Sequence, residues 1–310
     1  MKLNKVLVSG GKGTLGSAII DHLKEKKIRH FYFSSKKVDM TNLKNLDLFF
    51  KKNKPTHVIH TANKVFGIGG NASNKFEMIN ENLIINSNLF KICKKYKVKK
   101  ILCIGSSAVY SEKYKRRIKE KNIFRFDPHC SEFYYGLSKR IMLHQLISLN
   151  KQTGIKFCYV IMNNLYGIKD NFNVDTGHVI PSLIHKFYIA KKNNSVVKLW
   201  GNPKTKRSFL YTKDAAKIVL KLLDSKFSII NISSKQEVSI ENLSKMISKI
   251  YNFNGKVQWQ KKRHQGVSQR NLDTKLQNKL NINEYYSLED GLKETISWFK
   301  KKYNSSQIRK

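Results

Sequence analysis

The chain has 310 residues, of which 40% are hydrophobic and 11% aromatic, so it can bury a large core and is not a disordered polypeptide. Its 60 Lys and Arg residues against 21 Asp and Glu give a formal net charge of +39. The lysines are spread over almost every segment instead of clustering with aromatic residues on one element. We therefore expect no specific nucleic-acid partner. No apolar run approaches the ~18–20 residues of a membrane span, so we expect no membrane partner either.

The compartment is suggested by the N-terminus and the cysteines. Residues 1–5 lead into a short apolar segment without the features of an export signal. The four cysteines have no CxxC spacing, and two of them lie in apolar, strand-like runs: Cys93, Cys103, Cys130 and Cys158. We expect a cytoplasmic protein without a metal site or a disulfide framework.

In the first half of the chain, short apolar runs alternate with segments of helical spacing. Strands are predicted at 5–9, 31–33, 57–60, 100–104 and 157–161, and helices at 15–26, 43–52, 79–96 and 133–149. This alternation predicts βαβ units and a parallel sheet, and the nearly continuous apolar strands predict helices on both faces. The expected fold is a doubly wound α/β domain of the Rossmann type.

The rhythm loosens after about residue 165. Helices are predicted at 180–191, 213–223, 240–251 and 288–301, the last two capped by Ser239 and Ser287, with a strand at 227–232. We expect a nucleotide-binding domain over 1–165 with return segments around 195–232. A smaller, discontinuous substrate-binding lobe should occupy 166–310, ending in a frayed tail from Asn304.

Three glycines, Gly10, Gly13 and Gly16, stand between the first strand and the first helix. Glycine permits a tight turn and a close backbone approach, and the helix N-terminus favours an anion such as pyrophosphate. The position at the first strand–helix junction predicts a dinucleotide site that includes Lys12, Thr14 and Leu15.

The dinucleotide is predicted from the residues after the second strand. NAD usually requires an acidic residue there to bind the ribose 2′-hydroxyl, but this chain has Ser34-Ser35-Lys36-Lys37. Lys12 and Lys36 suit a 2′-phosphate, so NADP(H) is favoured over NAD(H). The alternative is that these lysines are ordinary solvated surface. Asp39 resembles the aspartate that contacts adenine in related enzymes.

Tyr135 and Lys139 form a YxxxK pair at the start of a predicted helix, where a spacing of four residues places both side chains on one face. A ketone that receives hydride needs a proton at the same time, and a nearby ammonium can lower the pKa of a phenol that supplies it. Lys139 would also hold the nicotinamide ribose. Ser106 follows the fourth strand, at the sheet edge where ligands bind in such folds. The combination predicts an oxidoreductase.

The chain resembles the GDP-L-fucose synthase family of extended short-chain dehydrogenases/reductases from end to end. The resemblance is carried by the segments His60-Thr61-Ala62-Asn63, Asn163-Asn164-Leu165-Tyr166-Gly167, Asp170-Asn171-Phe172, His178-Val179-Ile180-Pro181, Leu199-Trp200-Gly201 and Arg207-Ser208-Phe209-Leu210. It implies reduction of a GDP-linked 4-keto-6-deoxy sugar at C4 by NADPH, combined with epimerisation at C3 and C5.

The resemblance also implies roles for individual residues. Ser106, Tyr135 and Lys139 match the reductase triad, and His178 matches the acid of the epimerisation. A loop histidine satisfied by its neighbours is the alternative for His178. The implied substrate-binding residues, in addition to His178, are Ser107, Asn164, Lys186, Trp200, Arg207 and Arg270.

Three departures from the family pattern lie where the sugar would be recognised. Ala108 replaces the cysteine that acts as the epimerisation base, and Cys130 is the only conceivable substitute. Met162 replaces a proline, and the loop 263–270 lacks the family's Lys-Pro-Asp start. Epimerase activity is therefore in doubt, and a different hexose or a heptose is possible.

Alternative functions remain open. An NAD(P)-dependent sugar-nucleotide epimerase or dehydratase would consume no net cofactor, and a module that binds NADP(H) without turnover would need no triad. We expect a homodimer that pairs through the helices at 79–96 and 133–149.

Overall fold

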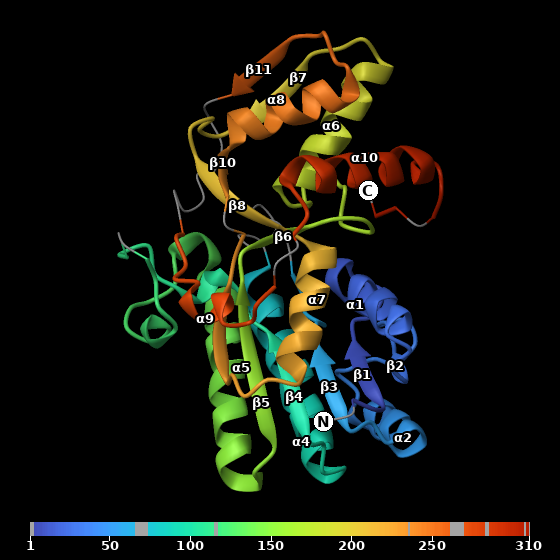
Figure 1. The fold of residues 1–310 in the computed structure, drawn as a ribbon, viewed down its shortest axis with the longest axis vertical. Coiled ribbons are helices and arrows are strands. Elements are labelled where there is room, and N and C mark those ends of the chain that lie inside the picture. Colours follow the sequence, from blue (N-terminus) through green and yellow to red (C-terminus); the bar gives the residue numbers. More distant parts are fainter. Residues whose placement is uncertain are drawn as a thin grey trace.

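The computed structural model describes residues 3–65, 74–114, 117–234, 236–260, 270–282, 285–306 and 308–309. Its largest element is a sheet of six parallel strands in the order β2-β1-β3-β4-β5-β9 (Figure 1). The strands are β1 (Val6–Ser9), β2 (His30–Tyr32), β3 (His57–His60), β4 (Lys100–Ile104), β5 (Lys156–Met162) and β9 (Ile229–Ile232). The strand order reverses at β1, which lies between β2 and β3, and ligands of open α/β sheets bind at such a switch point.

Helices cover both faces of this sheet. On one face α1 (Thr14–Glu25) packs against α7 (Thr212–Leu223), and on the other lie α2 (Leu43–Asn53), α4 (Lys75–Lys95) and α5 (Phe133–Thr153). Successive residues of a strand enter opposite cores, so Leu7 packs towards α2 and α4 while Val6 and Val8 pack towards α1. The doubly wound α/β fold predicted from the sequence is confirmed.

The smaller lobe lies beyond the carboxyl ends of the strands (Figure 1). It has a three-stranded sheet of β6 (Asn164–Tyr166), β8 (Lys206–Tyr211) and β10 (Glu237–Ser239), and a parallel pair of β7 (Val197–Trp200) and β11 (Val257–Gln260). The helices α6 (Val179–Lys192), α8 (Ile240–Tyr251) and α10 (Leu288–Lys302) supply its core, which includes the buried Phe172, Phe187 and Phe299. The short elements are α9 (Lys275–Asn278) and the 3₁₀ turns η1 (Ser107–Val109), η2 (Glu120–Asn122) and η3 (Cys130–Glu132).

The C-terminal half contains more strands than the sequence indicated. Within the predicted return segment 195–232, β9 is the last strand of the large sheet and α7 packs against one face of that sheet. In contrast, β7 of the same segment pairs with β11 in the lobe. The predicted caps of α8 and α10 are confirmed, because Ser239 and Ser287 accept hydrogen bonds from the backbone N–H groups of Asn242 and Asp290.

The prediction of a frayed C-terminal tail is wrong. Ile308 is buried, and the carbonyl of Arg309 accepts a hydrogen bond of 2.7 Å from the N–H of Phe172. The tail is thus fixed to the loop between β6 and α6, because its apolar side chain joins the core of the lobe.

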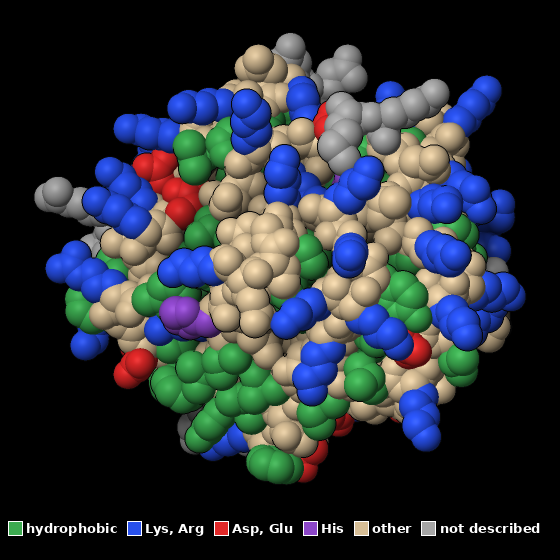
Figure 2. All heavy atoms as spheres, turned by 90° about the horizontal axis from the view of Figure 1, so that it is seen from below, with side chains coloured by type: hydrophobic (Ala, Val, Ile, Leu, Met, Phe, Trp, Pro, Cys, Tyr) green, Lys and Arg blue, Asp and Glu red, His purple; other side chains and the backbone are tan. Residues whose placement is uncertain are grey.

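Lys and Arg side chains are spread over the face shown in Figure 2, and acidic side chains are few among them. No helix in the described segments is long and apolar enough to cross a membrane. Cys103 and Cys158 are fully buried in β4 and β5, as their apolar surroundings predicted.

Candidate active site

The first turns of α5 carry Tyr135 and Lys139 on one face of the helix, as their spacing predicted. Lys139 is only 2% exposed, and its ammonium donates hydrogen bonds to Asn63 Oδ1 at 2.6 Å and to the carbonyl of Ile104 at 2.7 Å. Its Nζ lies 5.8 Å from the centre of the Tyr135 ring. Asn63 follows β3 and Ile104 ends β4, so the lysine is held at the carboxyl edge of the sheet.

Ser106 lies at the same edge, directly after β4. Its Oγ accepts a hydrogen bond of 3.1 Å from the N–H of Ala108, and its side chain is hydrogen-bonded to that of Tyr135. The structure therefore brings Ser106, Tyr135 and Lys139 together.

The pKa values of this group differ from the expectation. Burial raises the pKa of Tyr135, the charge of Glu132 raises it further, and the hydrogen bond with Ser106 lowers it only in part. We expected Lys139 to lower this pKa, and the net shift is in the opposite direction because burial dominates. Burial also lowers the pKa of Lys139 to about 7.

The glycine turn before α1 has the geometry of an anion site. Gly10 has a φ of 69°, and its carbonyl accepts a hydrogen bond of 2.9 Å from the N–H of Gly13. A Cβ at Gly16 would clash with the Gly10 carbonyl, so the helix can approach this closely only with glycine there. The first N–H groups of α1, from Thr14 and Leu15 on, have no acceptor within the helix, and Gly13 offers no side-chain cap. These free donors suit a pyrophosphate.

The segment after β2 is joined to this turn. The N–H of Gly11 donates to the carbonyl of Phe33 at 3.0 Å, which places the exposed Lys36 on the loop beside the glycine turn that carries the exposed Lys12. Asp39 is also exposed, and its carboxylate accepts hydrogen bonds from the N–H and hydroxyl of Thr41, which lower its pKa. Asp39 thus stabilises the loop, and the ammonium groups of Lys12 and Lys36 are the cations predicted to contact a phosphate.

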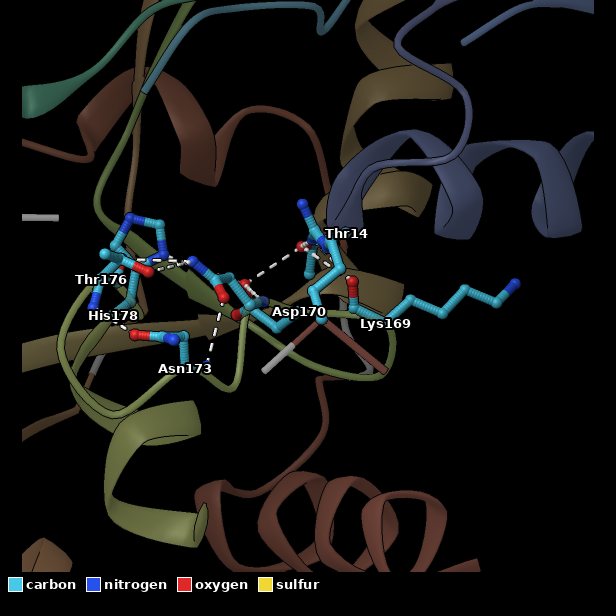
Figure 3. Close-up of polar contacts among 8 residues, drawn as sticks. Thr14, Lys169, Asp170, Asn173, Thr176 and His178 are labelled. Atoms are coloured by element: carbon cyan, nitrogen blue, oxygen red, sulfur yellow. Dashed lines mark hydrogen bonds and ion pairs between the residues drawn. The ribbon is translucent and has the colours of Figure 1, made fainter. Parts of the chain in front are cut away.

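His178 is the residue before α6 and faces Asp170 in the loop between β6 and α6. Its Nδ1 is 3.9 Å from Oδ1 of Asp170, and the imidazole is 60% exposed. The Asp170 carboxylate raises the pKa of His178, against the effect of the charge on Arg309. Asp170 in turn accepts a hydrogen bond of 3.1 Å from the Thr14 hydroxyl (Figure 3).

Arg207 and Arg270 lie close together on the lobe side. Burial and the nearby charge of Arg270 lower the pKa of Arg207. Arg270 also forms an ion pair of 2.7 Å with Glu132, the residue before α5. The charge of Glu132 raises the pKa values of Tyr135 and His178, which places this carboxylate among the predicted site residues.

The other predicted substrate residues lie on different elements of the lobe and the sheet edge. Asn164 opens β6, and its amide donates to the carbonyl of Ser208 at 3.0 Å. Lys186 of α6 lies over Trp200 of β7, with Nζ 3.7 Å from the ring centre. Ser107 is buried at the start of η1. The two pairs Lys186–Trp200 and Arg207–Arg270 are each assembled from separate segments.

The alanine at position 108 and the cysteines near it in sequence differ in exposure. Ala108 is fully buried, and the buried thiol of Cys103 has a raised pKa. Cys130 is exposed beside His129. Most of the loop 263–270, residues 263–269, lies outside the described residues. No cluster of His, Cys, Asp and Glu that could hold a metal is found in the described part of the chain.

Sequence reasoning missed three residues of this site: Asn63, Asp170 and Glu132. Asn63 and Asp170 stand in segments that carry the family resemblance, and Asn63 follows a strand at the ligand-binding edge, which was a usable signal. Glu132 lies three residues before Tyr135 and so on the same side of the helix start.

The comparisons with known proteins agree with this geometry. Residues 6–233 match the family model described as "NAD dependent epimerase/dehydratase family". The chain belongs to this family. Among its members, the GDP-L-fucose synthase of Dictyostelium discoideum is 31% identical over 97% of both chains. The resemblance noted in the sequence is therefore confirmed.

Two solved structures of this family extend the comparison. A GDP-L-fucose synthetase from Naegleria fowleri bound to NADP is 30% identical, with a TM-score of 0.91 over 100% of this chain and 96% of that one. A GDP-mannoheptose C4 reductase from Campylobacter jejuni with NADP bound is 27% identical, with a TM-score of 0.86 over 97% of this chain and 99% of that one. Both structures share the fold over nearly the whole chain.

Proposed function

We propose that this protein is an NADP(H)-dependent enzyme that reduces the C4 ketone of a GDP-linked 4-keto-6-deoxy sugar. The observation that carries the proposal is the meeting of Ser106, Tyr135 and the buried Lys139 at the carboxyl edge of β4. The glycine turn opens at the same edge of the sheet, as the switch point requires. Relatives named as GDP-L-fucose synthases and a GDP-sugar C4 reductase support the substrate class.

The side chains divide the reaction between them. Bound NADPH supplies the hydride that adds to C4. The Ser106 hydroxyl donates a hydrogen bond to the ketone oxygen, and the Tyr135 phenol gives its proton to that oxygen, which completes an alcohol. The raised pKa of Tyr135 keeps the phenol protonated at neutral pH, as a proton donor requires. Lys139, hydrogen-bonded to Asn63, would hold the nicotinamide ribose of the bound cofactor.

The cofactor preference rests on Lys12 and Lys36. Both are exposed on loops joined at the glycine turn, and no carboxylate stands in 34–38. These cations suit the 2′-phosphate of NADP(H). The test is the ratio of kcat/KM for NADPH and NADH, and a clear preference for NADH would contradict the assignment.

The nucleotide part of the substrate would bind to the smaller lobe. Arg207, Arg270 and Lys186 are basic residues that suit a diphosphate, and Trp200 and Asn164 offer an aromatic face and an amide. Ser107 and His178 would contact the sugar. Glu132 forms an ion pair with Arg270, so part of the positive charge at this site is balanced before the substrate binds.

The decisive experiment mixes the purified protein with GDP-4-keto-6-deoxymannose and NADPH. The expected result is loss of absorbance at 340 nm with one cofactor oxidised for each 6-deoxyhexose formed. No oxidation with any GDP-linked 4-keto sugar would refute the proposal. Turnover without net oxidation would instead favour the alternative of an epimerase or dehydratase.

Epimerisation at C3 and C5 is a separate question, because Ala108 cannot remove a proton. Running the reaction in deuterated water answers it. Deuterium at C3 and C5 of the product would show that another side chain acts as base, and deuterium at neither position would define a C4 reductase alone.

We further propose a cytoplasmic homodimer that pairs through the outer faces of α4 and α5, without nucleic-acid or membrane partners. Phe76 and Ile84 of α4 are 70% and 37% exposed, which supports a covered surface there. Light scattering should give a molecular mass twice that of one chain, and the Ile84→Glu variant should give the mass of a single chain.

A further inference from the structure

Asp170 is a buried carboxylate at the junction of the two parts of the molecule. It lies in the loop between β6 and α6 and is 4% exposed. Its Oδ1 accepts hydrogen bonds from the Thr14 hydroxyl at 3.1 Å and from the N–H of Asn171 at 2.7 Å, and lies 3.9 Å from His178 Nδ1. In Figure 3 the Asp170 side chain lies between the start of α1 and the histidine.

The turn that follows is held mainly by amide side chains. Asn173 Oδ1 accepts from the N–H groups of Asp175 and Thr176, and Asn171 Nδ2 donates to the carbonyl and hydroxyl of Thr176. The turn therefore has hydrogen bonds of its own in addition to the one that the N–H of Asn171 donates to Asp170.

The second carboxylate oxygen of Asp170 has no hydrogen-bond partner among the described residues, although it is buried. Burial of a charge without full compensation costs free energy. The cation-forming side chain that faces this carboxylate is His178, whose Nδ1 lies 3.9 Å from the other oxygen, Oδ1. Such a costly group at the junction indicates a role in orienting that imidazole.

Thr14 connects this carboxylate to the glycine turn. It is the first residue of α1 and directly follows Gly13. Its hydroxyl donates to Asp170 Oδ1 and accepts a hydrogen bond of 3.1 Å from Arg309, which also donates to the carbonyl of Lys169 at 2.8 Å. The first turn of α1, the loop and the C-terminal tail thus meet at one hydroxyl.

We infer that Asp170 is a positioning residue: its carboxylate orients the His178 imidazole towards the sugar, and the Thr14 hydroxyl ties that carboxylate to the glycine turn. Because Nδ1 is the nitrogen that faces Asp170, Nε2 is left to face the substrate, where it donates a proton in the imidazolium form and accepts one in the neutral form. The inference rests on the proposed function, in which His178 contacts the sugar.

The charged groups that act on His178 come from three elements. Asp170 on the loop and Glu132 before α5 raise its pKa, whereas Arg309 in the C-terminal tail lowers it. The net direction is upward, and Asp170 is the largest contribution.

The first test is the ¹⁵N NMR spectrum of His178 in the wild type, assigned by comparison with His178→Gln. Above the pKa, the remaining proton should reside on Nδ1, because that nitrogen faces the negative Asp170 carboxylate. A predominant Nε2–H form would overturn the inference. This measurement needs no substrate and no mutation of Asp170.

The second test compares Asp170→Asn with Asp175→Asn, which removes an exposed carboxylate from the same loop. The first change should move the titration midpoint of His178 to lower pH and lower kcat/KM for the 4-keto sugar about tenfold, with the KM for NADPH unchanged. The second should change neither. Equal midpoints in wild type and Asp170→Asn would overturn the inference.

The third test addresses Thr14. Thr14→Val should give a mixture of Nδ1–H and Nε2–H forms, and Thr14→Ser, which keeps the hydroxyl, should retain the wild-type form. An unchanged form in Thr14→Val would refute the link to α1. Absence of NADPH oxidation in the wild type would refute the proposed function and leave these spectra interpretable.

Discussion

The guanidinium of Arg270 lies 2.7 Å from the carboxylate of Glu132, and this ion pair joins the start of α5 to a segment near the C-terminus. The side chains are only 11% and 25% exposed. The pair therefore lies in a largely desolvated part of the site, where the loss of one partner leaves the other uncompensated.

Glu132→Gln should lower the free energy of unfolding by roughly 1–3 kcal/mol, because it leaves the Arg270 charge buried without its partner. Urea unfolding measures this effect. The control is Glu241→Gln on the exposed face of α8, expected within about 0.5 kcal/mol of the wild type. Equal stabilities of the two variants would count against the pair.

Tyr135→Phe should lower kcat for C4 reduction by roughly 10²–10⁴-fold, because no other group supplies the proton to the reduced oxygen. Binding of NADPH should persist, as measured by fluorescence. Tyr134→Phe is the matched control, since the neighbouring ring is 39% exposed and should tolerate the change. A Tyr135→Phe enzyme with more than a tenth of the wild-type rate would exclude Tyr135 as the proton donor.

Lys139 makes stability depend on pH. Its pKa is about 7 in the folded chain, against ~10.4 for an unperturbed lysine. Between these two pH values the unfolded chain binds more protons than the folded chain. The contribution of Lys139 to the free energy of unfolding therefore increases as the pH rises from about 7 and decreases as the pH falls back towards 7. Urea titrations from pH 7 to 9.5 should show a steeper rise for the wild type than for Lys139→Met. Lys36→Met, at an exposed position, should keep the wild-type slope, and parallel slopes for all three would contradict the assignment.

Lys12→Ala and Lys36→Ala should each raise the KM for NADPH roughly fivefold, because each removes a charge placed for the 2′-phosphate, worth about 1 kcal/mol. The KM for NADH should remain unchanged. The control is Lys151→Ala in the last turn of α5, at the opposite end of that helix from Tyr135. A parallel change for both cofactors would show that these lysines do not select NADP(H).

Features set by neighbouring residues could be predicted from the sequence. The caps at Ser239 and Ser287, the helical spacing of Tyr135 and Lys139, and the glycine turn at Gly10 depend on contacts within a few residues. The alternation of strands and helices is also local, because each face of a strand or helix must find an apolar partner. The parallel sheet could be predicted from this alternation.

The short strands of the lobe could not be predicted in this way. β7 pairs with β11, and β6 with β8, so each is stable only through a partner far along the chain. Their three to six residues show too little periodicity to be recognised alone. The order of β2, β1 and β3 in the large sheet likewise depends on tertiary packing.

The sequence by itself determined the fold class, the glycine turn and the pairing of Tyr135 with Lys139, because local spacing and the family motifs specify them. Only the tertiary structure placed Asp170 against Thr14, 156 residues away, and Asn63 against Lys139, 76 residues away. It also decided the direction of the Tyr135 pKa shift, because the burial of the phenol at the assembled site outweighs the effect expected from a neighbouring lysine. Contacts between distant segments and the burial they create arise only when the whole chain packs, so no local pattern encodes them.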